Sequence, residues 1–89
     1  MTNDAARQAK MTVLDELLAT DPATLTFDKS YESAGGSGDC LEVAKVPGKG
    51  YLLRHSILTD RLIPLTEGEY TAYVRGVQNG QSSLLPDSL

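Results

Sequence analysis

The sequence contains no tryptophan, one cysteine and one histidine, and its only aromatic residues are one phenylalanine and four tyrosines. A single cysteine cannot form a disulfide within the chain, so we expect a fold held by packing alone and a reducing compartment. At 89 residues the chain is long enough for a single domain, and so few aromatic residues make its core thin. We therefore expect association with a second copy or with another protein.

The sequence also lacks an excess of basic residues and any long apolar run. Its net charge is −4: residues 1 to 26 carry four acids and two bases, and residues 27 to 89 carry eight acids and six bases. Lys and Arg supply most affinity for phosphates, so we expect a basic or neutral protein partner and no direct nucleic-acid binding. No run is long enough to span a bilayer, and Arg7 and Lys10 interrupt the only early apolar stretch, so we expect a cytoplasmic protein.

The central stretch, residues 40 to 56, predicts two strands joined by a tight turn. Apolar residues alternate with polar ones along both halves, the period of a strand with one covered face, and on that face stand Leu41, Val43, Tyr51 and Leu53. Between the strands Pro47 and Gly48 suit the two central positions of a type II turn. Lys49 is expected to be solvated at the tip of this hairpin.

Residues 4 to 19 predict an amino-terminal helix, which ends before Pro22 because the residue before a proline is disfavoured in the α conformation. The apolar stripe of this helix includes Leu14, Leu17 and Leu18. Two interpretations remain open, since the stripe either lies on the chain's own sheet or is exposed as a seam for another chain.

Two more strands and a second helix are predicted around the central hairpin. Residues 24 to 31 alternate as a first strand, and residues 62 to 65 form a short edge strand because Pro64 has no amide hydrogen. A capping box of Thr66 and Glu69 opens the second helix, which ends at Asn79-Gly80 and carries an apolar stripe of Tyr70, Tyr73, Val74 and Val77.

The expected fold class is therefore α+β: a small antiparallel sheet of about four strands, with a carboxy-terminal helix packed on one face and an extra amino-terminal helix. Residues 1 to 89 form one domain, with a sheet-plus-helix core over residues 24 to 80 and a frayed tail over residues 81 to 89. The glycine-rich residues 33 to 39 are expected to be a flexible loop, because a phosphate-binding loop requires a helix directly after it.

Cys40 and His55 are the residues most suited to chemistry, and both have a structural interpretation. A lone cysteine at a strand usually packs as a small apolar residue, and His55 fits a hydrogen-bonded position in the sheet. A Cys40–His55 nucleophile pair, or a metal site completed by a carboxylate, is the alternative, but it lacks a third catalytic member and the paired spacing of metal ligands. We expect no catalytic residue, no metal and no cofactor.

Several short motifs occur in a distinctive order. They are Phe27-Asp28-Lys29-Ser30, a Gly/Ser loop, Asp39-Cys40-Leu41-Glu42-Val43-Ala44, Leu53-Arg54-His55-Ser56, Pro64-Leu65-Thr66 and Glu69-Tyr70-Thr71-Ala72-Tyr73. In this order residues 27 to about 80 resemble the small actinobacterial domain-of-unknown-function family that includes the BldB-type developmental regulators. That family has Trp where this sequence has Phe27 and Tyr70, and an acid where it has His55. The amino-terminal helix lies outside the resemblance.

The resemblance implies a cytoplasmic regulator of development or antibiotic production. Members of that family are thought to bind helix-turn-helix transcription regulators in an antitoxin-like manner, and some self-associate. We therefore expect a non-enzymatic protein that binds such a regulator and forms a homodimer, with five candidate anchors: Leu14, Leu17, Leu18, Tyr70 and Tyr73. A self-assembling structural protein and a small thiol- or metal-dependent enzyme using Cys40 and His55 are the alternatives.

Overall fold

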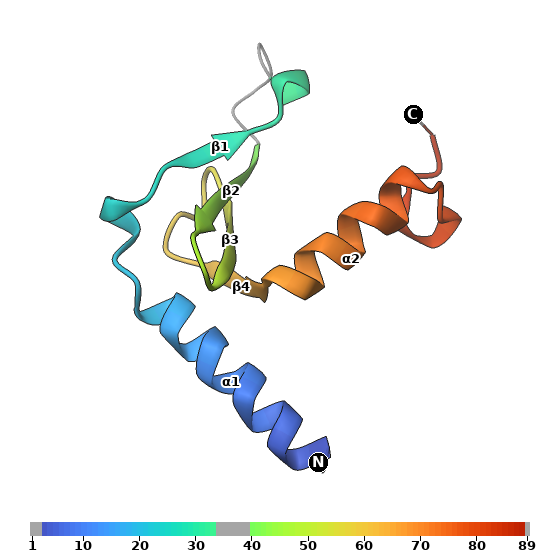
Figure 1. Ribbon diagram of the computed structural model, residues 1–89. Helices are drawn as coiled ribbons and strands as arrows, with labels where there is room; N and C mark the ends of the chain where they lie inside the picture. Colours follow the sequence, from blue (N-terminus) through green and yellow to red (C-terminus); the bar gives the residue numbers. More distant parts are fainter. Residues whose placement is uncertain (1–2, 34–39, 89) are drawn as a thin grey trace.

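The computed structural model describes residues 3–33 and 40–88. In chain order it contains α1 (Asn3–Ala19), β1 (Phe27–Lys29), β2 (Leu41–Val46), β3 (Gly50–His55), β4 (Leu62–Thr66) and α2 (Glu67–Gln78), with short 3₁₀ turns at Pro22–Thr24, Tyr31–Ser33 and Ser82–Leu84. The four strands form one sheet in the order β1-β2-β3-β4, and every neighbouring pair is antiparallel (Figure 1). This arrangement confirms the expected α+β class.

The core lies between α1 and one face of the sheet, here called the covered face. The strand register places Phe27, Ala44, Leu52 and Pro64 side by side on this face. Leu17 of α1 and Leu52 have no exposed surface, and together with Val46 they form the buried cluster. The amino-terminal helix thus lies on its own sheet, and Leu14 and Leu17 belong to the core.

The central hairpin has the predicted turn. Gly48 has a φ of 78°, and the amide of Lys49 donates to the carbonyl of Val46 at 3.0 Å. Gly50 lies so close to β4 that a Cβ at this position would overlap the carbonyl oxygen of Leu65. A glycine is therefore required where β3 and β4 approach each other.

Two ion pairs connect α1 to distant parts of the chain. Lys10 Nζ lies 3.4 Å from Glu69 Oε2 at the start of α2. Lys49 Nζ lies 3.0 Å from Glu16 Oε2, so the hairpin tip is paired with α1, whereas the sequence predicted a solvated lysine. Pairs as exposed as these contribute at most about 1 kcal/mol each, and they mainly orient the helix.

The first strand is shorter than predicted from residues 24 to 31. Asp21 Oδ1 accepts from the amide of Ala23 at 3.0 Å, and this cap opens a 3₁₀ turn in place of the first strand residues. At the other end Tyr31 begins a second 3₁₀ turn, where its side chain is 98% exposed. The predicted glycine-rich loop falls mostly on residues 34–39, which lie outside the described residues.

The capping box that opens α2 is confirmed. Glu69 donates its amide to Thr66 Oγ1 at 3.2 Å, and Glu69 Oε1 accepts from the amide of Thr66 at 2.9 Å. This helix does not lie along a sheet face as expected: it contacts the sheet near its amino-terminal end, where Tyr70 meets Tyr51 of β3, and extends away from the sheet beyond it (Figure 1). The reason is that α2 begins at the residue after β4 ends, so no loop turns the helix back.

The segment directly after α2 turns back on the helix, where the sequence predicted the start of a frayed tail. Gln81 donates its amide to the carbonyl of Gly76 at 3.0 Å, which turns the chain back on the helix. A Cβ on Gly76 would lie 2.7 Å from Leu84 Cδ1. Leu84 therefore occupies the space that this glycine leaves, and it extends the apolar surface of α2.

Candidate functional site

The face of the sheet opposite α1 is apolar and uncovered, and it is here called the open face. The register aligns Val43, Leu53 and Ile63 across β2, β3 and β4, flanked by Leu41, Tyr51 and Leu65. Leu41 and Ile63 are each 58% exposed. Alternation predicted that Leu41 and Val43 would face the core, but α1 packs on the other face, with Ala44, Val46 and Leu52.

A hollow of about 300 Å³ lies at one end of the open face. Apolar side chains from β2, β3, β4 and the loop before β4 form most of its wall, and Arg54, His55 and Arg61 stand at its edge; the apolar members are Leu41, Leu53, Leu58 and Ile63. Leu58 is 47% exposed. The hollow continues the apolar surface of the sheet.

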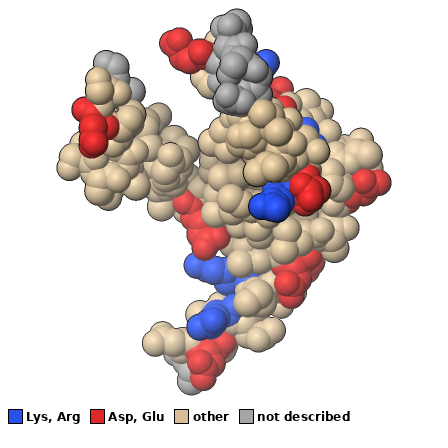
Figure 2. All heavy atoms as spheres, turned by 180° about the vertical axis from the view of Figure 1, so that it is seen from behind, with Lys and Arg blue, Asp and Glu red and all other residues tan. Residues whose placement is uncertain are grey.

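A second hollow of about 260 Å³ lies between the sheet and α2. The rings of Tyr51 and Tyr70 meet at its base with their centroids 4.2 Å apart, and Val74 lines it one turn further along the helix. Tyr73, on the same helix, is 51% exposed. Figure 2 shows α2 and the segment after it as a lobe of mostly uncharged residues, separated from the rest of the molecule by a notch.

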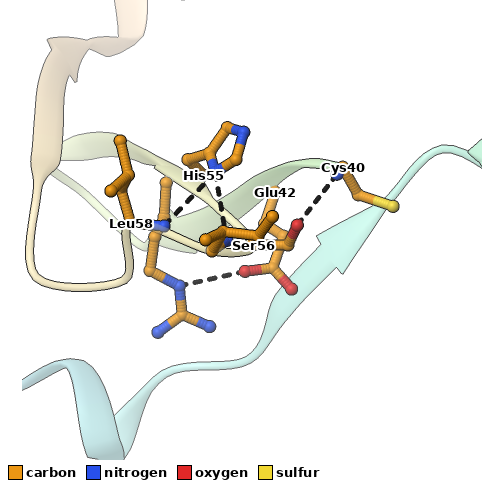
Figure 3. Close-up of polar contacts among 7 residues, drawn as sticks. Cys40, Glu42, His55, Ser56 and Leu58 are labelled. Carbon is orange, nitrogen blue, oxygen red and sulfur yellow. Dashed lines mark hydrogen bonds and ion pairs between the residues drawn. The ribbon is translucent and has the colours of Figure 1, made fainter. Parts of the chain in front are cut away.

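Cys40 and His55 do not meet. Residue alternation places Cys40 on the covered face and His55 on the open face, opposite Leu41. The Cys40 thiol is buried and points away from the imidazole (Figure 3). Cys40 donates its amide to Ser56 Oγ at 2.9 Å, and Ser56 returns a bond from its amide to the Cys40 carbonyl at 2.9 Å. The two residues thus close the end of the hairpin and form no thiolate–imidazole pair.

His55 shapes the turn that follows β3. Its Nδ1 accepts from the amide of Ile57 at 3.0 Å and from the amide of Leu58 at 3.2 Å (Figure 3). An accepting Nδ1 places the imidazole proton on Nε2 in the neutral ring. This ring supplies the hydrogen-bonded role that the sequence predicted, and it positions Leu58 at the hollow on the open face.

Glu42 and Arg54 form an ion pair that the sequence analysis missed. Arg54 Nε donates to Glu42 Oε1 at 3.0 Å, and the guanidinium carbon lies 3.7 Å from the centroid of the Phe27 ring. Opposite charges at facing positions of the hairpin are the signal that predicts this pair. With its carboxylate engaged in this pair, Glu42 acts as a structural group.

The structure places the five candidate anchors in three different environments. Leu17 is fully buried, and Leu14 is partly buried and packs against the core. Leu18 is 50% exposed and lies on the outer side of α1. Its neighbour there is Met11, which is 42% exposed and was not predicted as an anchor. Tyr70 and Tyr73 lie on α2 beside the open face. Two separate apolar surfaces are therefore accessible.

The comparisons with known proteins give no assignment. No family model matches the chain, and neither a curated protein nor a solved structure matches it. Within residues 3–33 and 40–88, no three His, Cys, Asp or Glu side chains are grouped closely enough to hold a metal ion. In that same part of the chain, no helix has the length and apolar character needed to cross a membrane.

Proposed function

We propose that this chain is a non-enzymatic, cytoplasmic regulator that binds a helix-turn-helix DNA-binding protein and changes its activity. The observation that carries this proposal is the outer stripe of α1, formed by Met11, Asp15 and Leu18. These residues stand at i, i+4 and i+7 and therefore share one side of the helix. Both apolar members are about half exposed although the helix is anchored to the sheet through its other side.

The outer stripe combines apolar side chains with a carboxylate, a combination suited to binding a basic helix of a partner. Asp15 stands between two apolar side chains, and toward the amino terminus Asp4 and Arg7 continue the same line with opposite charges. Aliphatic groups supply contact area, while carboxylates favour a cationic partner over an anionic one. DNA-binding surfaces are basic, so a chain with a net charge of −4 is suited to mask one. The resemblance described above favours such a partner in actinobacterial development or antibiotic production.

Affinity purification of the tagged chain from its native host tests this function, with a matched pair of variants. Leu18→Asp places a charge in the outer stripe, whereas Thr12→Asp places the same charge on a different, also exposed side of α1 outside the stripe. We expect a stoichiometric helix-turn-helix protein with the wild type and with Thr12→Asp, and its loss with Leu18→Asp. Recovery of the chain alone would contradict the proposal and favour a self-assembling structural protein.

A further inference from the structure

The molecule exposes more surface than a compact chain of its size. Its accessible surface is 6761 Å², whereas a compact monomer of 9.5 kDa exposes about 5,000 Å². Its radius of gyration is 14.8 Å, compared with about 12 Å for a compact domain of this length. The surplus of about 1,700 Å² exceeds the roughly 800 Å² that each partner buries in a standard stable interface.

Two apolar elements that the chain does not bring together contribute to this surplus. The first is the open face, whose residues alternate as they do in a strand with that face covered. The second is the apolar stripe of α2, formed by Tyr70, Tyr73, Val74 and Val77, of which Tyr73 is 51% exposed and the other three are partly buried. Beyond its first turn the helix extends away from the sheet (Figure 1). An amphipathic helix normally buries such a stripe against another element.

We propose that a second copy of this chain covers these elements, with α2 of each copy lying on the open face of the other. A twofold axis relates the copies, so that one contact is made twice and both unpartnered elements are buried. The hollow between Tyr51 and Tyr70 is where the entering helix contacts both walls, and Ile63 lies on the open face of the edge strand β4, in register with Leu53. This dimer leaves the outer stripe of α1 free in both copies.

Analytical ultracentrifugation of the purified chain at micromolar concentrations tests the dimer. We expect a species of twice the chain mass of 9.5 kDa. Ile63→Asp should weaken the dimer about 30-fold or more, because an unpaired carboxylate would be buried at the interface. Tyr31→Asp is the matched control, since Tyr31 is 98% exposed on a turn outside both elements and its variant should remain dimeric. A monomeric wild type would overturn the proposal.

Tyr73→Asp tests the helix side of the same interface, and it keeps the proposal open to refutation if Ile63→Asp does not fold. Tyr73 is 51% exposed on α2, so the charge is tolerated by the monomer. We expect a folded monomer by circular dichroism and ultracentrifugation. A dimer that survives both Ile63→Asp and Tyr73→Asp would place the interface elsewhere and refute the reciprocal arrangement.

Disulfide crosslinking tests the reciprocal arrangement directly. Two chains, one carrying Ile63→Cys and the other Tyr73→Cys, are mixed and oxidised, each with Cys40→Ala to remove the native thiol. We expect more crosslinked dimer from this mixture than from a mixture in which Tyr31→Cys replaces Tyr73→Cys. Equal yields would refute the contact between α2 and the open face. Leu18→Asp should dimerise normally, so a failure of partner binding and a failure of dimerisation are distinguished.

Discussion

At the residue scale, His55 shows how one side chain holds a turn. Its Nδ1 accepts two backbone hydrogen bonds, from Ile57 and Leu58, which a short acidic side chain also accepts in an Asx turn. The role of His55 shown by the structure is therefore that of a hydrogen-bond acceptor for this turn.

We expect His55→Asp to retain the stability of the wild type and His55→Leu to lower the free energy of unfolding by about 1 kcal/mol. The reason is that leucine leaves the two amides without their acceptor. Urea denaturation followed by circular dichroism measures both variants. An equal loss in the two variants would show that the imidazole contributes by packing instead.

Glu69 is the residue whose ionisation is coupled to folding. Its pKa is lowered, chiefly because its carboxylate accepts from the Thr66 amide, and further because Lys10 lies close by; partial burial opposes both effects. A carboxyl group with a lower pKa in the folded than in the unfolded state stabilises the fold at pH values above its unfolded pKa. This stabilisation is lost as the pH falls through the folded pKa.

The variant Glu69→Gln isolates this contribution, because glutamine keeps an acceptor for the capping box and removes the charge. We expect it to be less stable than the wild type at pH 7 by about 0.5 kcal/mol, since the carboxylate is partly exposed. The difference should shrink as the pH falls below the ordinary value of 4.5. Thermal unfolding at a series of pH values measures this difference, with Glu67→Gln as the control. A difference between wild type and Glu69→Gln that stays constant with pH would contradict the link between Glu69 ionisation and folding.

At the element scale, very few side chains hold α1 against the sheet. Leu17 is the only fully buried residue among the described residues of this helix, and it meets Val46 and Leu52 on the covered face. Ion pairs at Lys10 and Glu16 add little energy because they are exposed. The position of α1 is therefore determined mainly by one leucine and its neighbours.

We expect Leu17→Ala to lower the free energy of unfolding by about 2 to 5 kcal/mol, the range for a buried leucine truncated in a rigid core. In a domain whose total stability is roughly 5 to 15 kcal/mol, this is a large fraction. Leu18→Ala is the matched control, because Leu18 is half exposed on the same turn and should cost less than about 1 kcal/mol. Chemical denaturation of both variants gives the comparison, and equal losses would place Leu17 outside the core.

At the scale of the whole molecule, apolar area is distributed unevenly. One face of the sheet is covered by α1, while the other face and most of α2 are left open. A chain with one such small core is expected to have marginal stability as a monomer. The reciprocal dimer that we propose would resolve this imbalance, because it would cover both open elements and add a second packed layer to each sheet.

Much of the secondary structure was predictable because its signals are local. The capping box at Thr66 and Glu69, the turn at Gly48 and the edge strand containing Pro64 each depend on neighbouring residues, and the structure contains all three. The first strand was predicted too long because the cap of Asp21 on Ala23 competes with strand pairing. A side-chain cap and a strand ladder offer the backbone two alternative sets of hydrogen bonds of similar energy, so the sequence alone does not show which one forms.

The candidate surfaces were predictable only in part. Leu18 and Tyr73 were identified as candidate anchors and are exposed, but Leu14 and Leu17 lie in the core. Periodicity shows that a helix has an apolar stripe and does not show what the stripe packs against. Ile63 was missed as a surface residue because an isoleucine in a strand is usually buried.

The sequence by itself determined the α+β class, the order of the elements and the two-sided pattern of each strand, because backbone conformation responds to neighbouring side chains. Only the tertiary structure decided which face of the sheet α1 covers and how far α2 extends from it. Both faces carry enough apolar side chains to bind a helix, so the choice depends on how the connections after α1 and β4 direct the chain. That choice leaves the face of Leu41 and Val43 open for a partner.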